Sequence, residues 1–205
     1  MLLLTFLVAI VVNFVGYIPL GNINLTSMQI SINKGMKQAL IFITSFAIVE
    51  GIFTYVLMRF AEWFATKKEF LHWLGWILVV VFIVMGLLSW IESHKEPKLK
   101  DDDIRNKDSI RTGIFLGVFN PMIIPFWMIG GTYLIAKNWI TTKTPGLELF
   151  ALGAAIGSFL CLYLFAHFAQ YIQNRFSFSN KIINRSIALV FFALAIFQTC
   201  KELFF

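Results

Sequence analysis

The chain has 205 residues, of which 59% are hydrophobic and only 14% are charged, and its formal net charge is +6 at pH 7. No ordinary soluble domain is this apolar, so the composition excludes that class and indicates an integral membrane protein. The basic balance does not indicate a nucleic-acid partner, because no basic stripe with interleaved aromatic residues accompanies it.

Six apolar segments meet the requirement of about 20 predominantly apolar residues for a helix that spans a bilayer. In chain order they cover residues 2–20 (or, with a longer first segment, 2–32), 39–61, 70–91, 112–136, 147–172 and 182–203. The first has no basic residue ahead of it and no small-residue cleavage site after it, so we interpret it as a transmembrane helix and not as a signal peptide. The sequence therefore predicts an all-α protein with six transmembrane helices.

A polar stretch with six acidic and six basic residues, 92–111, separates three of these helices from the other three. We interpret it as a solvated cytoplasmic linker between a first three-helix repeat, 1–91, and a second, 112–205. Because each repeat has an odd number of helices, the two must be inserted with opposite orientations, which makes an inverted-topology repeat. Small residues at four-residue spacing in the second helix of each half favour this interpretation, and Gly51 and Gly153 are 102 positions apart.

Lysine and arginine predict the orientation, because cytoplasmic loops carry an excess of both. With six helices and an outside N-terminus, eleven of these residues fall on the inside and six on the outside. We therefore expect both termini to lie outside the membrane.

The first and fourth segments are interrupted by proline and asparagine, and the interruptions are 102 residues apart. The residues concerned are Pro19, Gly21, Asn22 and Asn24 in the first, and Asn120, Pro121 and Pro125 in the second. Proline removes a backbone donor and clashes with the carbonyl four residues earlier, so each helix should break there and leave polar backbone groups unpaired. Matching breaks in two half-chains are the best sequence indication of a transporter's binding site.

Glu50 lies at the centre of the second segment, too deep in the membrane for its side chain to reach the surface. An ionisable group there costs roughly 2.5 to 3.5 kcal/mol and is by default a candidate functional residue. Since no lysine or arginine lies near the middle of any segment, Glu50 either stays protonated or pairs with a proton or a substrate ammonium group. The alternative is a neutral structural side chain that is hydrogen-bonded to a neighbouring helix.

Four short motifs accompany the six segments: Pro19-Leu20-Gly21-Asn22, Asn33-Lys34-Gly35, Trp73-Leu74-Gly75 and Asn120-Pro121. With them the chain resembles, over nearly its whole length, the lysine-exporter (LysE-type) translocators, bacterial exporters of amino acids and related small metabolites. The resemblance implies a transporter of the bacterial cytoplasmic membrane. Two departures are that Pro19-Leu20-Gly21 replaces the usual Pro-Gly-Pro, and that Met122 replaces a common lysine, which leaves the substrate open.

These features combine into a hypothesis for secondary active export of a zwitterion. Its carboxylate would lie against the half-helix ends after Pro19 and Pro121, with hydrogen bonds from Asn22, Asn24 and Asn120. Its amine would face Glu50, whose protonation would couple export to the proton gradient by alternating access. The asparagines could instead cap the broken backbone. Trp127 could flank the cavity, or it could be packed in the interior or face lipid.

Other function classes fit the sequence less well. A thiol relay needs cysteines at the breaks, but Cys161 and Cys200 lie in the fifth and sixth segments. An enzyme needs a nucleophile and base or a metal motif, and neither is visible; we expect no cofactor. Efflux of a heavy metal or another cation is the main alternative, although three scattered histidines do not form a ligand cluster. The expected partners are a small-molecule substrate and the lipid bilayer, and the sequence is compatible with a homo-oligomer.

Overall fold

The computed structural model describes residues 1–18, 21–66, 68–94, 108–120 and 122–169, together with 171, 185, 188, 189, 191–193, 195–197, 199, 200 and 203. Within these residues all regular secondary structure is helical, as expected. Two of the described helices are long and apolar enough to cross a membrane, at Met36–Trp63 and Gly146–His167, and several shorter apolar helices accompany them.

The first half of the chain forms four helices. They are α1 (Leu2–Gly16), α2 (Asn22–Lys34), α3 (Met36–Ala65) and α4 (Lys68–Glu92). The second half forms α6 (Ser109–Val118), α7 (Ile123–Ala136) and α8 (Gly146–His167). Most of the predicted linker, residues 95–107, lies outside the described residues, as does much of the predicted sixth segment. The first and fourth predicted segments are each split into two helices, as the proline and asparagine pattern predicts.

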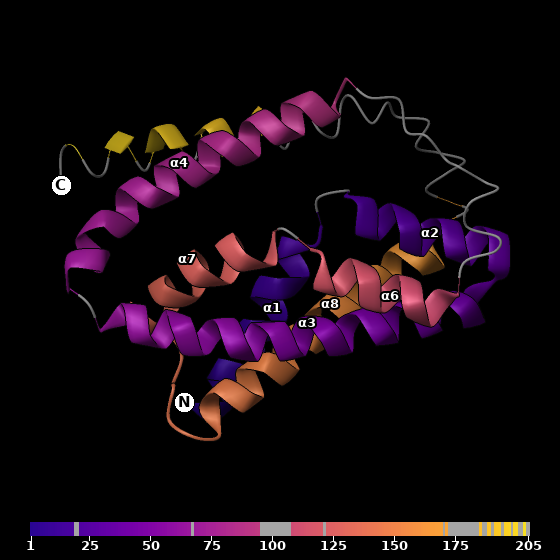
Figure 1. Cartoon of the computed structure of the whole chain (residues 1–205), viewed down its shortest axis with the longest axis horizontal. Coiled ribbons are helices and arrows are strands. Elements are labelled where there is room, and N and C mark those ends of the chain that lie inside the picture. Colours follow the sequence, from indigo (N-terminus) through magenta and orange to yellow (C-terminus); the bar gives the residue numbers. More distant parts are fainter. Residues whose placement is uncertain are drawn as a thin grey trace.

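The two halves are interleaved (Figure 1). The split helix of the first half, α1 and α2, packs on α8 of the second half, and the split helix of the second half, α6 and α7, packs on α3 of the first. The long helices α3 and α8 also pack against each other. Each half therefore supplies one long helix that supports the broken helix of the other half.

Glycine pairs bring the broken helices close to their supports. A Cβ atom on Gly113 or Gly117 of α6 would lie 2.6 Å from the Phe42 carbonyl oxygen or 2.8 Å from Val49, both in α3. In the same way, Gly153 and Gly157 of α8 lie against the backbone of α1. Small residues allow this approach, and van der Waals packing then holds membrane helices together without a hydrophobic driving force.

Gly51 and Gly153, which match in the sequence, do not make equivalent contacts. Gly51 of α3 faces Ala155 of α8, whereas Gly153 of α8 faces Phe6 and Ala9 of α1. Their spacing therefore does not extend the correspondence of the two halves to individual side chains.

Three polar side chains of the first half donate hydrogen bonds to backbone carbonyls of α8. Asn13 Nδ2 donates to Ala154 (2.6 Å), Ser27 Oγ to Leu162 (3.0 Å) and Ser31 Oγ to Ala166 (2.7 Å). Such bonds between helices replace the water that a polar side chain loses in a membrane. They attach both parts of the broken helix to the same support.

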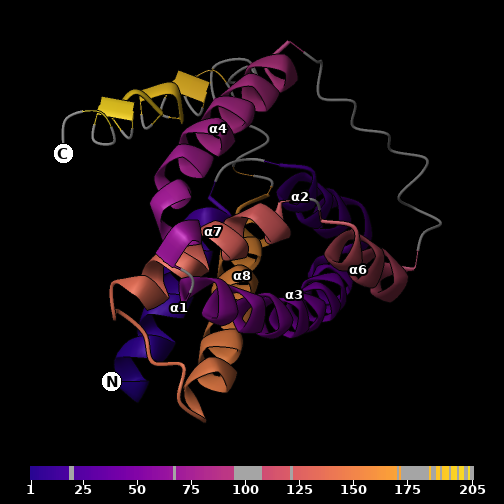
Figure 2. The ribbon, with the colours of Figure 1, turned by 60° about the vertical axis from the view of Figure 1, so that its left-hand side comes forward.

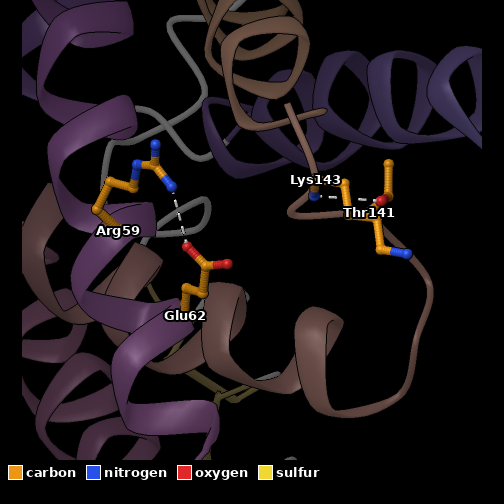
Figure 3. A network of polar contacts seen from close by, with 4 residues as sticks. All are labelled: Arg59, Glu62, Thr141 and Lys143. Carbon is orange, nitrogen blue, oxygen red and sulfur yellow. Dashed lines mark hydrogen bonds and ion pairs between the residues drawn. The ribbon is translucent and has the colours of Figure 1, made fainter. Parts of the chain in front are cut away.

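Polar groups collect at the two ends of the bundle. At the end that holds the N-terminus, the Thr141 backbone N–H donates to Thr5 Oγ1 (3.0 Å), and Arg59 pairs with Glu62 at the end of α3 (3.2 Å). Figure 3 shows this ion pair and the loop contact from Lys143 to Thr141. At the opposite end, Ser109 Oγ donates to Gln38 Oε1 (2.8 Å).

Helix α4 lies along one side of the bundle and contacts α3 and α7 (Figure 2). Described residues of the last segment lie beside it. The Phe82 and Phe191 rings are 6.3 Å apart, and the Arg185 guanidinium lies 5.3 Å from the Trp90 ring. The third predicted helix of the first half thus contacts the last segment of the second half.

Candidate functional site

The first break lies between α1 and α2. Helix α1 ends at Gly16 with Tyr17 as its C-cap, and α2 begins at Asn22 after the N-cap Gly21. The side chain of Asn24 turns back across this gap, and its Nδ2 donates to the Tyr17 carbonyl oxygen (2.5 Å). Asn24 therefore satisfies a carbonyl that the break leaves outside the helix. The sequence predicts this break from Pro19, which lies outside the described residues.

The second break lies between α6 and α7, and here too an asparagine side chain bonds to the backbone at the break. Helix α6 ends at Val118 with Phe119 as its C-cap, 102 positions after Tyr17. Asn120 Oδ1 accepts from the Met122 backbone N–H (3.2 Å). Pro121 lies outside the described residues. Pro125 falls in the first turn of α7, where a missing N–H costs no helical hydrogen bond, so it does not break the helix.

The two breaks touch each other. Asn120 Nδ2 donates to the Tyr17 hydroxyl (3.0 Å), and this bond joins the end of α6 to the end of α1. Nearby, a Cβ atom on Gly16 would lie 2.9 Å from the Phe126 ring, so the end of α1 also packs against α7. Positions that are 103 residues apart in the chain thus meet inside the bundle.

Glu50 lies beside this junction, at the midpoint of the 30-residue helix α3, and only 1% of its surface is exposed. The polar groups of Tyr17, Asn13 and Trp127 surround its carboxyl group. In the described part of the chain no lysine or arginine is paired with it. A buried carboxyl group without a cationic partner is costly unless it is protonated or binds a cation.

Three buried polar atoms around Glu50 have no hydrogen-bond partner among the described residues: Glu50 Oε2, Thr54 Oγ1 and the Trp127 indole N–H. Thr54 is one helical turn after Glu50 and is fully buried. Trp127 is also fully buried, between the rings of Phe126 (4.7 Å) and Phe150 (5.1 Å), so the lipid-facing alternative for this residue is wrong. Unsatisfied buried polar groups are rare, and here an acceptor and two potential donors lie together.

The structure brings some of the predicted site residues together and leaves others apart. Glu50, Asn120 and Trp127 converge on the junction, whereas Asn24 is tied to the broken backbone beside it. Gly21 and Asn22 are exposed at the start of α2. The sequence did not mark Tyr17, although a tyrosine hydroxyl next to a break, far from the interfacial belts, is a recognisable signal. Thr54 was also missed, although it shares a helix face with Glu50.

The starts of α2 and α7 differ in their N-cap residues. The N-cap of α2 is Gly21, and among the described atoms nothing lies within 4 Å of the position that a Cβ on Gly21 would take. The N-cap of α7 is Met122, whose side chain makes no capping bond and whose backbone N–H donates to Asn120 Oδ1. A helix N-terminus attracts anions, and the open space beside Gly21 lies at such an end.

Among the residues that the structure describes, no group of three His, Cys, Asp or Glu side chains is placed to hold a metal ion. Cys161 is buried in α8, and Cys200 is exposed.

The family model described as LysE type translocator matches residues 14–201, which include both breaks, Glu50 and Trp127. No curated protein and no solved structure matches the chain.

Proposed function

The chain belongs to the LysE type translocator family, a family of multi-pass membrane transporters, and on this premise we propose that it exports amino acids or related small zwitterionic metabolites. The observation that carries the proposal is the position of Glu50, a buried carboxyl group without a cationic partner at the point where two broken helices meet. Such a site suits a substrate that has both a positive and a negative group.

The ammonium group of the substrate would bind at the junction. Glu50 Oε2 and Thr54 Oγ1 supply oxygens that accept or donate no hydrogen bond within the part of the chain that the structure describes. The carboxylate would bind at the start of α2, where the helix N-terminus lies beside the open space at Gly21. This placement narrows the hypothesis from the sequence, because Asn120 already engages the Met122 backbone at the start of α7.

Coupling to protons is the second part of the proposal. The Tyr17 hydroxyl accepts a hydrogen bond from Asn120, so its own proton can be donated toward Glu50. In the empty transporter Glu50 would carry a proton, and substrate binding would release it. Alternating access would move the two interleaved halves as an inverted repeat around this point, in the bacterial cytoplasmic membrane with both termini outside.

The test is efflux of a labelled amino-acid panel from proteoliposomes that contain the parent protein, Glu50→Gln or the matched control Glu62→Gln. Glu62 lies in the same helix but is partly exposed and pairs with Arg59 at its end. We expect Glu50→Gln to lower export of the substrate about tenfold to a hundredfold, because a hydrogen bond to a charged group contributes about 1.5 to 3 kcal/mol. Glu62→Gln should export at the parent rate.

Export by Glu50→Gln at the parent rate, with the same dependence on the proton gradient, would contradict both roles of Glu50. The same liposomes loaded with Zn²⁺, Cd²⁺ or Co²⁺ test cation efflux. Metal export by the parent without amino-acid export would favour that alternative function instead.

A further inference from the structure

A groove lies on the surface of the bundle between α3 and α6, two helices that run side by side (Figure 1). Gly113 and Gly117 of α6 pack against α3, and Gly113 lies directly against Ser45, which also lines the groove. The volume of the groove is about 380 Å³, within the range of roughly 300 to 1,000 Å³ that is typical of small-ligand sites. The lining residues are Leu40, Ile41, Thr44, Ser45 and Ile48 of α3 and Ile110 of α6.

The walls of the groove are mostly apolar and partly open to the surroundings. Four of the six lining side chains are aliphatic, and two of these, Ile48 and Ile110, are 58% and 49% exposed. The Ser45 hydroxyl donates to the Phe42 carbonyl oxygen (2.9 Å), so it needs no further partner. Because α3 is long and apolar enough to cross a membrane, these walls face hydrocarbon and suit an acyl chain.

The groove covers about the depth of one leaflet. On α3, its wall continues a row that begins at Lys37, and the members of the row are Lys37, Ile41, Thr44 and Ile48. Their intervals of four, three and four residues place them on one face of the helix. From Lys37 to Ile48 the helix rises about 16 Å at 1.5 Å per residue. Since half of a hydrocarbon core is about 15 Å, the groove extends from the membrane surface to about the midplane.

Positive charge lies at the surface end of the groove. Lys37 is exposed one helical turn before Ile41. Arg111 follows Ile110, and its side chain is 89% exposed. The acid beside them, Asp108, accepts from the Ile110 N–H (2.9 Å) and pairs with Arg111 at 3.8 Å. Two cations and one anion leave a net positive charge at this end. With both termini outside, as the sequence predicts, this end faces the cytoplasm, where anionic lipids attract basic residues.

We propose that the groove between α3 and α6 binds an anionic phospholipid of the cytoplasmic leaflet. One acyl chain lies along the aliphatic wall of α3, and the phosphate group lies at Lys37 and Arg111. The lipid fills the space beside the contact between the two helices and thereby supports α6, which leads to Asn120 and to the junction of the two breaks. Lipid binding does not depend on the transport function proposed above.

Native mass spectrometry of the purified protein in detergent measures the bound lipid. The protein is titrated with phosphatidylglycerol, which is anionic, or with zwitterionic phosphatidylcholine that carries the same acyl chains. Lys37→Gln and Arg111→Gln remove the charges, and Lys143→Gln is the matched control, because Lys143 is exposed in a loop at the other end of the bundle. Thr44→Trp fills the groove, and Ile52→Trp is its control, because Ile52 is exposed on α3 but does not line the groove.

We expect the parent to bind phosphatidylglycerol at least about tenfold more tightly than phosphatidylcholine, and high salt should reduce this difference. Lys37→Gln and Arg111→Gln should each weaken binding of phosphatidylglycerol about fivefold. Thr44→Trp should lose the bound lipid while it unfolds at the parent temperature, and both controls should bind as the parent does.

Equal affinity for the two lipids would overturn the proposal, and so would parent-like lipid binding by Lys37→Gln and Thr44→Trp. A lipid-free dimer that Thr44→Trp dissociates would also overturn it, because a second copy of the chain would then cover the groove. The glutamine variants decide the matter on their own if Thr44→Trp does not fold, since they change only exposed side chains.

Discussion

The two helix breaks use asparagine in different ways. At the first break, Asn24 lies after the gap and its amide group serves the chain before it, since Nδ2 donates to the Tyr17 carbonyl (2.5 Å). At the second break, Asn120 lies before the gap, and its side chain bonds both to the backbone after the gap and to the first break. Its Oδ1 accepts from the Met122 N–H (3.2 Å), and its Nδ2 donates to the Tyr17 hydroxyl (3.0 Å).

The two asparagines therefore have different roles: one only supports its own break, and the other also links the two breaks. Asn24 closes its own break, whereas Asn120 closes its break and also connects it to the other one. At the second break the Asn120 side chain bonds to the backbone of Met122, the N-cap residue of α7. At the first break the N-cap residue is Gly21, and no described atom lies beside it. Substitutions at the two breaks should therefore differ in their effects on stability and transport. The expected effects are given from the largest to the smallest.

Asn120→Ala should have the largest effect. It removes the acceptor of the Met122 N–H and the donor to the Tyr17 hydroxyl, two hydrogen bonds of about 1 kcal/mol or more each, so we expect a loss of about 2 to 3 kcal/mol in the free energy of unfolding. Export should fall with it. Thermal unfolding in detergent, followed by tryptophan fluorescence, measures the loss. Asn120→Ser keeps an oxygen for the Met122 N–H but cannot reach Tyr17, so its loss should be intermediate.

Asn24→Ala should come second, with a loss of about 1 to 2 kcal/mol, because the Tyr17 carbonyl loses a buried donor. Asn22→Ala is the matched control, since Asn22 is exposed in the same helix and should leave the melting temperature unchanged. A parent-like melting temperature for Asn24→Ala would mean that Asn24 does not support the break.

Tyr17→Phe should cost about 1 kcal/mol, because it removes only the hydroxyl that Asn120 contacts. Its effect should not add to that of Asn120→Ala, because each variant breaks the same hydrogen bond. A double-mutant cycle on unfolding in detergent checks this, and strict additivity would show that the two breaks are not linked. Export by Tyr17→Phe should also lose part of its dependence on the proton gradient.

Gly21→Ala should have the smallest effect on stability, since the backbone of Gly21 is extended and the added methyl group meets open space. The KM for export should nevertheless rise about fivefold or more, because a methyl group placed in an occupied site costs about 1 kcal/mol or more. Gly130→Ala, which also faces open space, is the control. An unchanged KM for Gly21→Ala would remove the start of α2 from the substrate site.

The sequence predicted the breaks and the buried acid because both depend on local chemistry. Proline and asparagine in an apolar segment are incompatible with a continuous membrane helix, and a glutamate at the centre of α3 has no route to water. The C-cap residues of α1 and α6, Tyr17 and Phe119, are 102 positions apart, which is the spacing of the two motifs in the sequence.

The parts that were missed depend on tertiary contacts. Nothing in the sequence shows that the Tyr17 hydroxyl meets Asn120, since this contact joins residues that are 103 positions apart. Gly51 and Gly153 match in spacing but face different helices, because packing follows the surface of each neighbour and not the register of a repeat. The sequence left two roles open for Asn24, substrate binding and capping of the backbone. In the structure its amide group donates to the backbone carbonyl of Tyr17.

The bonds from Asn13, Ser27 and Ser31 to α8 also affect how the protein is made. A ribosome delivers α1 and α2 long before α8, so these three donors have no acceptor there while the first half enters the bilayer. The first half thus cannot complete its own hydrogen bonds. A chain that stops before Gly146 should be cleared by membrane proteases, whereas simultaneous production of both halves as separate chains should restore its accumulation.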